Sequence, residues 1–93
     1  MDLTPDTRLI RAEERFLSNP VGDETLLLDL STGDYVALNE TAARIWDMLR
    51  QPRTVRELTD ALGNEFDIDP GQCLSDTLGY LRAIEALQLL VQV

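Results

Sequence analysis

Two short stretches near the middle of the chain are rich in apolar residues and bounded by turn formers, a pattern that is typical of β-strands. The first covers residues 25–30 and the second about residues 34–38, and a turn-forming segment with Gly33 joins them. The leucines expected on one face of the first stretch are Leu26, Leu28 and Leu30. An earlier strand is expected around residues 16–17, before a cluster of turn formers at residues 19–23. The pattern predicts a three-stranded antiparallel sheet.

After this sheet the apolar residues recur every three or four positions, which predicts amphipathic helices. Asn39 is the expected N-cap of a first helix over residues 40–50. A second helix is expected to begin after Thr54, because Glu57 three residues later completes a capping box. Its end is expected near the Gly-Asn pair at residues 63–64.

Asp69 followed by proline predicts the start of a third helix, which extends to about residue 87. The final segment, residues 89–93, is rich in strand formers and either adds a strand or packs onto the sheet. Residues 1–8 are expected to form a flexible N-terminal tail, and residues 9–93 a single domain. The predicted fold is therefore α+β, a winged helix-turn-helix with three strands followed by three helices (βββααα).

The composition of the chain argues against several classes of binding partner. The chain has 17 acidic and 8 basic residues among its 93, a net charge of −9, which argues against nucleic acid and anionic membranes as partners. The charge favours a basic or neutral partner, or serves only solubility. The N-terminus lacks the apolar segment of a signal peptide, and no apolar run approaches the roughly 18 residues of a membrane span. A cytoplasmic location is expected.

Catalytic chemistry is not expected, because the chain has no histidine and only one cysteine. Cys73 falls in the third helix, where a free cysteine is usually a core or groove-lining residue, although a small hydrolase built on it remains an alternative. No metal or cofactor motif is present. DNA binding by a winged-helix regulator is a second alternative, but the third helix offers Arg82 against Asp76 and Glu85.

Three groups of residues form a joint pattern. The first is LLLDLSTGDYVALNETAARIWDML, residues 26–49, and the second is Thr54-Val55-x-x-Leu58. The third is Asp76-x-x-x-Tyr80-Leu81-x-x-Ile84 followed by Leu89-Leu90. Together they resemble the PqqD-like family, also called RiPP recognition elements, and the similarity covers about residues 24–91. Gln88 departs from it, because the family often has glycine before the final Leu-Leu pair.

The resemblance implies a protein without catalytic activity that binds the leader region of a ribosomally made precursor peptide. The leader would be added as an antiparallel strand to the edge of the third predicted strand, beside the third helix. The protein would then deliver the precursor to a processing enzyme. The chain is most similar to the discrete recognition proteins of lasso peptide pathways, in which the enzymes would be a leader peptidase and a cyclase.

Two sets of residues are the expected peptide-binding site. They are Asp34, Tyr35, Val36, Ala37 and Leu38 on the strand, and Cys73, Asp76, Thr77 and Tyr80 on the third helix. Backbone pairing by residues 34–37 does not depend on side-chain direction. Asp76 and the acidic total would suit a leader that carries Lys or Arg. For Tyr35, packing into the core remains an alternative to binding the peptide. For Cys73 and Thr77, the alternative is that they only fill the contact between the helix and the sheet.

Overall fold

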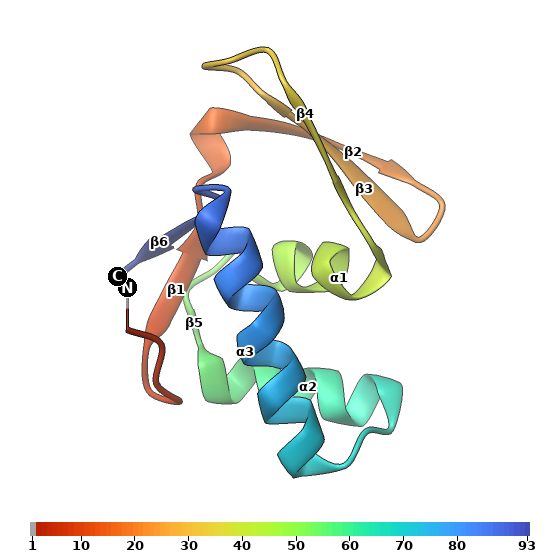
Figure 1. The fold of residues 1–93 in the computed structure, drawn as a ribbon, viewed down its shortest axis with the longest axis vertical. Helices are drawn as coiled ribbons and strands as arrows, with labels where there is room; N and C mark the ends of the chain where they lie inside the picture. The colour runs from red at the N-terminus through yellow and green to blue at the C-terminus, as the bar shows by residue number, and fades with distance from the viewer. Residues whose placement is uncertain (1) are drawn as a thin grey trace.

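The structure of the protein, a computed structural model, describes residues 2–93 and is an α+β arrangement of two antiparallel sheets and three helices (Figure 1). The elements are β1 (Arg8–Arg11), a 3₁₀ turn η1 (Glu13–Arg15), β2 (Phe16–Val21), β3 (Glu24–Asp29), β4 (Tyr35–Leu38), α1 (Glu40–Met48), β5 (Arg53–Thr54), α2 (Val55–Phe66), α3 (Pro70–Ala86) and β6 (Leu90–Gln92). One sheet has the strand order β2-β3-β4 and is called the wing sheet below; the other has the order β5-β1-β6.

The α+β class, the antiparallel β2-β3-β4 sheet and the three helices agree with the sequence analysis. The strict βββααα order does not, because β1, β5 and β6 form a second sheet. Its strands come from the beginning, the middle and the end of the chain, and β5 has only two residues. Strands this short carry no recognisable alternation, so their long-range pairing left no signal in the sequence.

The N-terminal segment lies along the start of α2. Of the tail predicted over residues 1–8, Met1 lies outside the described residues. The carbonyl oxygens of Pro5 and Thr7 accept hydrogen bonds from the backbone N–H groups of Arg56 (2.9 Å) and Val55 (3.0 Å). The first N–H groups of a helix have no partner within the helix, so this segment satisfies two of them.

The wing sheet buries one of its two faces. The sequence predicted that the face with Leu26, Leu28 and Leu30 would be buried, but the opposite face is. Leu27 is fully buried opposite Val36, whereas Leu26 and Leu28 are only half-buried and Leu30 is exposed. Five of the six residues at positions 25–30 are apolar or a threonine, so the alternation there is weak. Contacts with α1 decide which face turns inward, and they place Leu27 in the core.

The helix starts follow the predicted capping, but the end of α2 does not. Asn39 Oδ1 accepts a hydrogen bond from Ala42 N at 3.0 Å, and Thr54 and Glu57 form the full capping box. Helix α2 continues past Gly63 to Phe66, and the left-handed residue after it is Asp67, with φ 53°. A Cβ on Gly63 would lie 3.5 Å from Cys73 Sγ, an ordinary contact distance, so Gly63 faces α3 from within α2 and does not end the helix.

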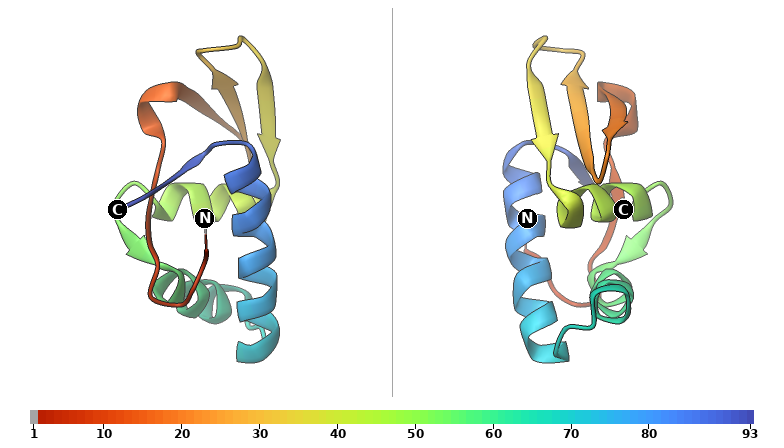
Figure 2. Two further views of the ribbon diagram at one scale, coloured as in Figure 1. Left: turned by 60° about the vertical axis from the view of Figure 1, so that its left-hand side comes forward. Right: turned by 90° about the vertical axis from the view of Figure 1, so that its right-hand side faces the viewer.

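The core lies between the helices and the inner faces of both sheets. Trp46 is at its centre, with the ring of Phe16 edge-on at 6.0 Å and the guanidinium of Arg11 over the indole at 5.0 Å. The side chains that are fully buried include Leu9, Leu27, Ile45, Leu49, Val55, Leu58, Leu81 and Leu89. Both views in Figure 2 show the C-terminal end of α3 next to the lower end of β4. That placement positions the candidate site.

Candidate peptide-binding site

The wing sheet has two outer strands, β2 and β4, and each presents backbone groups away from β3. Just before β4, Asp34 O accepts a hydrogen bond from Asp29 N at 2.8 Å, and within β4 the register pairs Val36 with Leu27. Because an antiparallel strand alternates the direction of its backbone groups, Val36 and Leu38 bond to β3. Tyr35 and Ala37 therefore direct their N–H and C=O groups to the free edge.

The β2 edge is blocked in a way that the β4 edge is not. Leu30 N donates to Arg15 O at 2.9 Å. By the same alternation, the backbone groups of Ser18 and Pro20 are directed to the free edge of β2. Proline has no N–H to offer there, and prolines in sheets are confined to such outward positions. Among the described residues of the wing sheet, β4 is therefore the edge with a complete set of outward donors.

A small apolar cavity of about 200 Å³ lies between β4 and α3. Its lining residues are Ala37, Leu38, Asn39, Ala42, Tyr80, Ala83, Ile84 and Leu87. Strand β4 supplies one wall and helix α3 the other, because Tyr80, Ala83, Ile84 and Leu87 recur at helical spacing on one face of α3 and its end. An extended chain at the β4 edge would direct alternate side chains toward this cavity.

A second, open hollow continues from the first along α3. It measures about 480 Å³ and is lined by Ser75, Asp76, Gly79, Tyr80 and Ala83. Tyr80 and Ala83 line both cavities. We call the two together the α3 trough: its upper part is the apolar cavity beside β4, and its lower part is the hollow over Gly79.

The structure brings some of the predicted site residues together. Ala37 and Leu38 face Tyr80 across the apolar cavity, and Asp76 lies in the lower part of the trough. Asp34 is exposed in the turn before β4, where its N–H donates to Thr32 Oγ1 at 3.2 Å.

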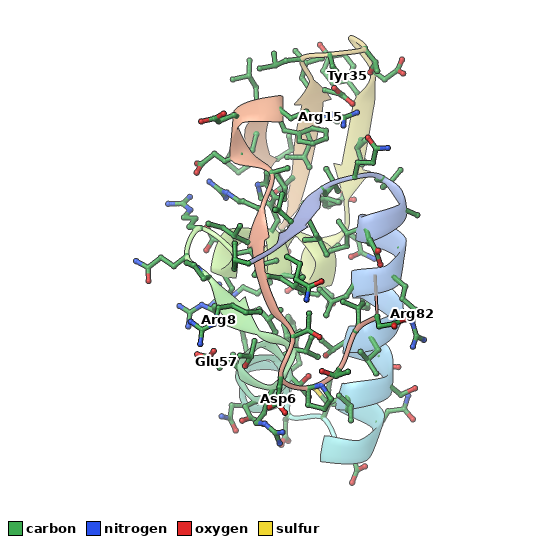
Figure 3. The ribbon with its side chains drawn as sticks, turned by 90° about the vertical axis from the view of Figure 1, so that its left-hand side faces the viewer. Asp6, Arg8, Arg15, Tyr35, Glu57 and Arg82 are labelled. Atoms are coloured by element: carbon green, nitrogen blue, oxygen red, sulfur yellow. The ribbon has the colours of Figure 1, made fainter. Side chains whose placement is uncertain are left out.

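Tyr35 lies 66% exposed on the outer face of the wing sheet, near its tip (Figure 3), and not in the trough. Packing of Tyr35 into the core, one of the two alternatives, is thereby excluded.

Cys73 and Thr77 do not line the trough. Their exposed fractions are 2% and 1%, and Cys73 Sγ lies 3.2 Å from Thr59 O of α2, to which it donates. These two residues therefore fill the contact between α3 and α2, nearer the N-terminal end of α3 than the residues that line the trough.

Asn39, Ala83 and Leu87 line the trough and were missed. Ala83 and Leu87 follow Tyr80 at intervals of three and four along α3, so extending the helical face from Tyr80 would have found them.

Another cavity, of about 550 Å³, lies between α2 and α3. Its lining includes Arg56, Asp60, Asp67 and the buried sulfur of Cys73. The cavity mixes charges of both signs, and no strand of either sheet contributes to its walls. It therefore lacks the backbone groups that an extended peptide would need.

The outer face of the wing sheet carries no charge along its three strands except at Glu24. The register places Leu17, Leu28 and Tyr35 in one row and Asn19, Leu26 and Ala37 in the next. Val21 lies opposite Glu24 at the end of the sheet. Leu17 and Tyr35 are 58% and 66% exposed, so the face is apolar and open. It adjoins the free edge of β4 directly.

Arg15 links the wing sheet to the end of α3 (Figure 3). Its Nη2 donates to Asp29 Oδ2 at 3.1 Å and its Nη1 to Gln88 Oε1 at 2.5 Å. Hydrogen bonds from Arg15 and then from Ser31 hold the pKa of Asp29 well below its usual range. Gln88 has φ 62°, and Leu89 N donates to Ile84 O at 3.2 Å, so the turn after α3 keeps its geometry without a glycine.

No helix among residues 2–93 is long and apolar enough to cross a membrane. Within the same residues, no group of three or more Cys, Asp or Glu is placed to hold a metal ion.

An open strand edge beside an apolar trough is the arrangement by which small domains bind extended peptides. The chain belongs to the PqqD family: the family model described as coenzyme PQQ synthesis protein D (PqqD) matches residues 24–90. The resemblance inferred from the sequence is thereby confirmed. No curated protein matches the chain.

Among solved structures, the chain is similar to TbiB1 in complex with the TbiA(beta) leader peptide. The two share 32% sequence identity with a TM-score of 0.74, over 83% of this chain and 90% of that one.

Proposed function

We propose that this protein binds the leader region of a ribosomally synthesised precursor peptide and has no catalytic activity of its own. The leader adds as a strand to the edge of β4, and its side chains alternate between the α3 trough and the outer face. The observation that carries the proposal is the pair of outward backbone groups at Tyr35 and Ala37, next to the apolar cavity formed with α3. The similarity to TbiB1, solved with a leader peptide, supports it.

The direction of the bound leader follows from the direction of β4. This strand runs from the tip of the wing sheet at Tyr35 down to α1 at Leu38 (Figure 1). A leader added antiparallel to it enters over the trough and leaves at the tip. Its N-terminal part therefore lies along α3, and the segment to be processed emerges beside Tyr35.

Delivery to a processing enzyme is the second half of the proposal. The enzyme is a leader peptidase or a cyclase, as in lasso peptide pathways, and it docks on the uncharged outer face around Leu17, Leu28 and Tyr35. This face is apolar in a chain whose charged fraction is 27%, as expected of an interaction surface. A leader strand on β4 would extend the same face, so the enzyme would meet protein and leader together.

Titration of the purified protein with a synthetic leader, taken from a precursor gene beside its own, tests the proposal. Fluorescence anisotropy of a labelled leader should give saturable binding at micromolar protein or below, and a scrambled peptide should not bind. A duplex DNA arm tests the alternative of a transcriptional regulator, for which α3 offers a single cation, Arg82. A folded protein that leaves the leader unbound at tens of micromolar would refute leader recognition.

A further inference from the structure

The lower part of the α3 trough contains a carboxylate that pairs with no arginine among the described residues. Asp76 is exposed and accepts one hydrogen bond, from Gln72 Nε2 to its Oδ1 at 2.8 Å. Other carboxylates of the chain do pair with arginines, namely Asp6, Glu13, Asp29, Asp47 and Glu65. Asp76 thus presents a negative charge to a hollow whose described lining residues include no cation.

The hollow beside Asp76 exists because residue 79 has no side chain. A Cβ built on Gly79 would meet nothing within 4 Å, so packing within this chain does not require the glycine. In the middle of a helix a glycine costs about 1 kcal/mol relative to alanine. The space above Gly79 is therefore available to a ligand.

We propose that this hollow binds the side chain of a lysine or arginine in the leader. The inference rests on the proposed leader-binding function and adds the chemistry of one subsite. The aliphatic part of the side chain lies over Gly79 and Ala83 and along the ring of Tyr80, and its cationic end reaches Asp76. The net charge of −9 attracts such a peptide at long range.

The geometry also predicts where in the leader the basic residue lies. From Ala83, which lines both parts of the trough, to Asp76 is seven positions on α3, or about 10 Å at 1.5 Å per residue. An extended peptide covers this distance in about three residues. With the antiparallel direction argued above, and since only alternate residues of an extended strand face the trough, the basic residue lies about two or four positions N-terminal to the residue that enters the apolar cavity beside Leu38.

The test is a scan with peptides derived from the leader of the neighbouring precursor gene. Each position of its N-terminal half is replaced in turn by Lys, Gln and Glu, and Kd is measured by competition anisotropy. At one position Lys should bind about two- to fivefold more tightly than Gln, as expected for an exposed ion pair, and Glu more weakly than Gln. The difference should shrink at high salt.

Three variants of the protein assign the effect to the subsite. Asp76→Asn should remove the preference for Lys, and Asp76→Lys should reverse it so that the Glu peptide binds best. Asp60→Asn, which removes an acid from α2 and from the other cavity, is the matched control and should keep the wild-type preference. Gly79→Leu fills the hollow and should remove the preference while the protein stays folded by circular dichroism.

The two levels of the proposal fail differently. If the wild-type protein binds the leader but no position distinguishes Lys from Glu, the basic subsite is wrong and leader recognition stands. The subsite is equally wrong if Asp76→Lys shows the same preference as the wild type. If the folded protein binds no leader peptide at all, the proposed function itself fails.

Discussion

Replacing Ala37 by proline removes one backbone donor from the free edge of β4 and leaves the bonds to β3 in place. The register directs Ala37 N–H outward and Val36 N–H toward Leu27 of β3. The side chain at position 37 is exposed, so the proline ring meets no core residue. The substitution therefore tests the free edge of β4 without disturbing the fold, and we expect it to weaken leader binding without unfolding the protein.

The magnitude follows from the single hydrogen bond that is lost. A backbone hydrogen bond contributes about 0.5–1.5 kcal/mol net, which corresponds to about a two- to twelvefold increase in Kd. The ring also occupies the place of the hydrogen-bonded leader carbonyl, so the upper part of this range is expected. The free energy of unfolding should change by less than about 1 kcal/mol, because no bond to β3 is lost.

Two further prolines are the controls for this experiment. Ser18→Pro alters the free edge of β2 in the same sheet and should leave the Kd of the leader unchanged. Val36→Pro breaks a bond to β3 and should lower the free energy of unfolding by about 1–3 kcal/mol. Anisotropy with labelled leader gives the Kd and urea denaturation the stability. Wild-type affinity in a folded Ala37→Pro variant, or an equal loss in Ser18→Pro, would place the leader elsewhere.

Three other predictions concern the outer face, the acid end of the pH range and the cysteine. Leu17→Asp should leave the Kd of the leader within about twofold but slow leader cleavage by the cognate peptidase about five- to thirtyfold. Gln51→Asp, which adds the same charge elsewhere on the surface, is the control and should cleave at the wild-type rate. A wild-type cleavage rate with Leu17→Asp would refute docking on this face. Hydrogen bonds from Arg15 and Ser31 lower the pKa of Asp29 in the folded protein. The free energy of unfolding that Asp29→Asn removes should therefore be constant above about pH 5 and become smaller as the pH falls below about 4. Urea denaturation of both proteins at each pH measures this difference. Cys73→Ala should lower stability by about 1 kcal/mol and leave both leader binding and pathway activity intact, whereas loss of pathway activity in a folded, leader-binding variant would favour a hydrolase.

Local signals predicted most of the fold. The capping residues Asn39, Thr54 and Asp69 lie where three helices begin, because a cap is a contact within a few residues of the chain. The second sheet was missed because its pairs join Arg8 to Thr54 and Leu9 to Gln92, and no local pattern encodes such partners. The end of α2 was misplaced because Gly63 meets Cys73 across the helix pair rather than ending the helix.

The candidate site was predictable as a region but not residue by residue. The strand 34–38 and the third helix were chosen correctly as neighbours, and Tyr80 lines the cavity with Leu38. Cys73, Thr77 and Tyr80 share one face of α3, but α2 packs on the N-terminal part of that face and buries Cys73 and Thr77. The sequence could therefore not separate the groove-lining residues of α3 from those that hold α3 in place.

Pro20 carries information about the sheet edges that the sequence analysis did not use. As a member of the cluster at residues 19–23 it predicted only a break in regular structure. In the structure it lies inside β2, at a position that faces the free edge, where its missing N–H prevents pairing with another strand. A sheet with one edge blocked by proline and the other left with free donors is asymmetric. Pro20 therefore leaves β4, at the opposite edge, as the strand to which the proposed leader would add.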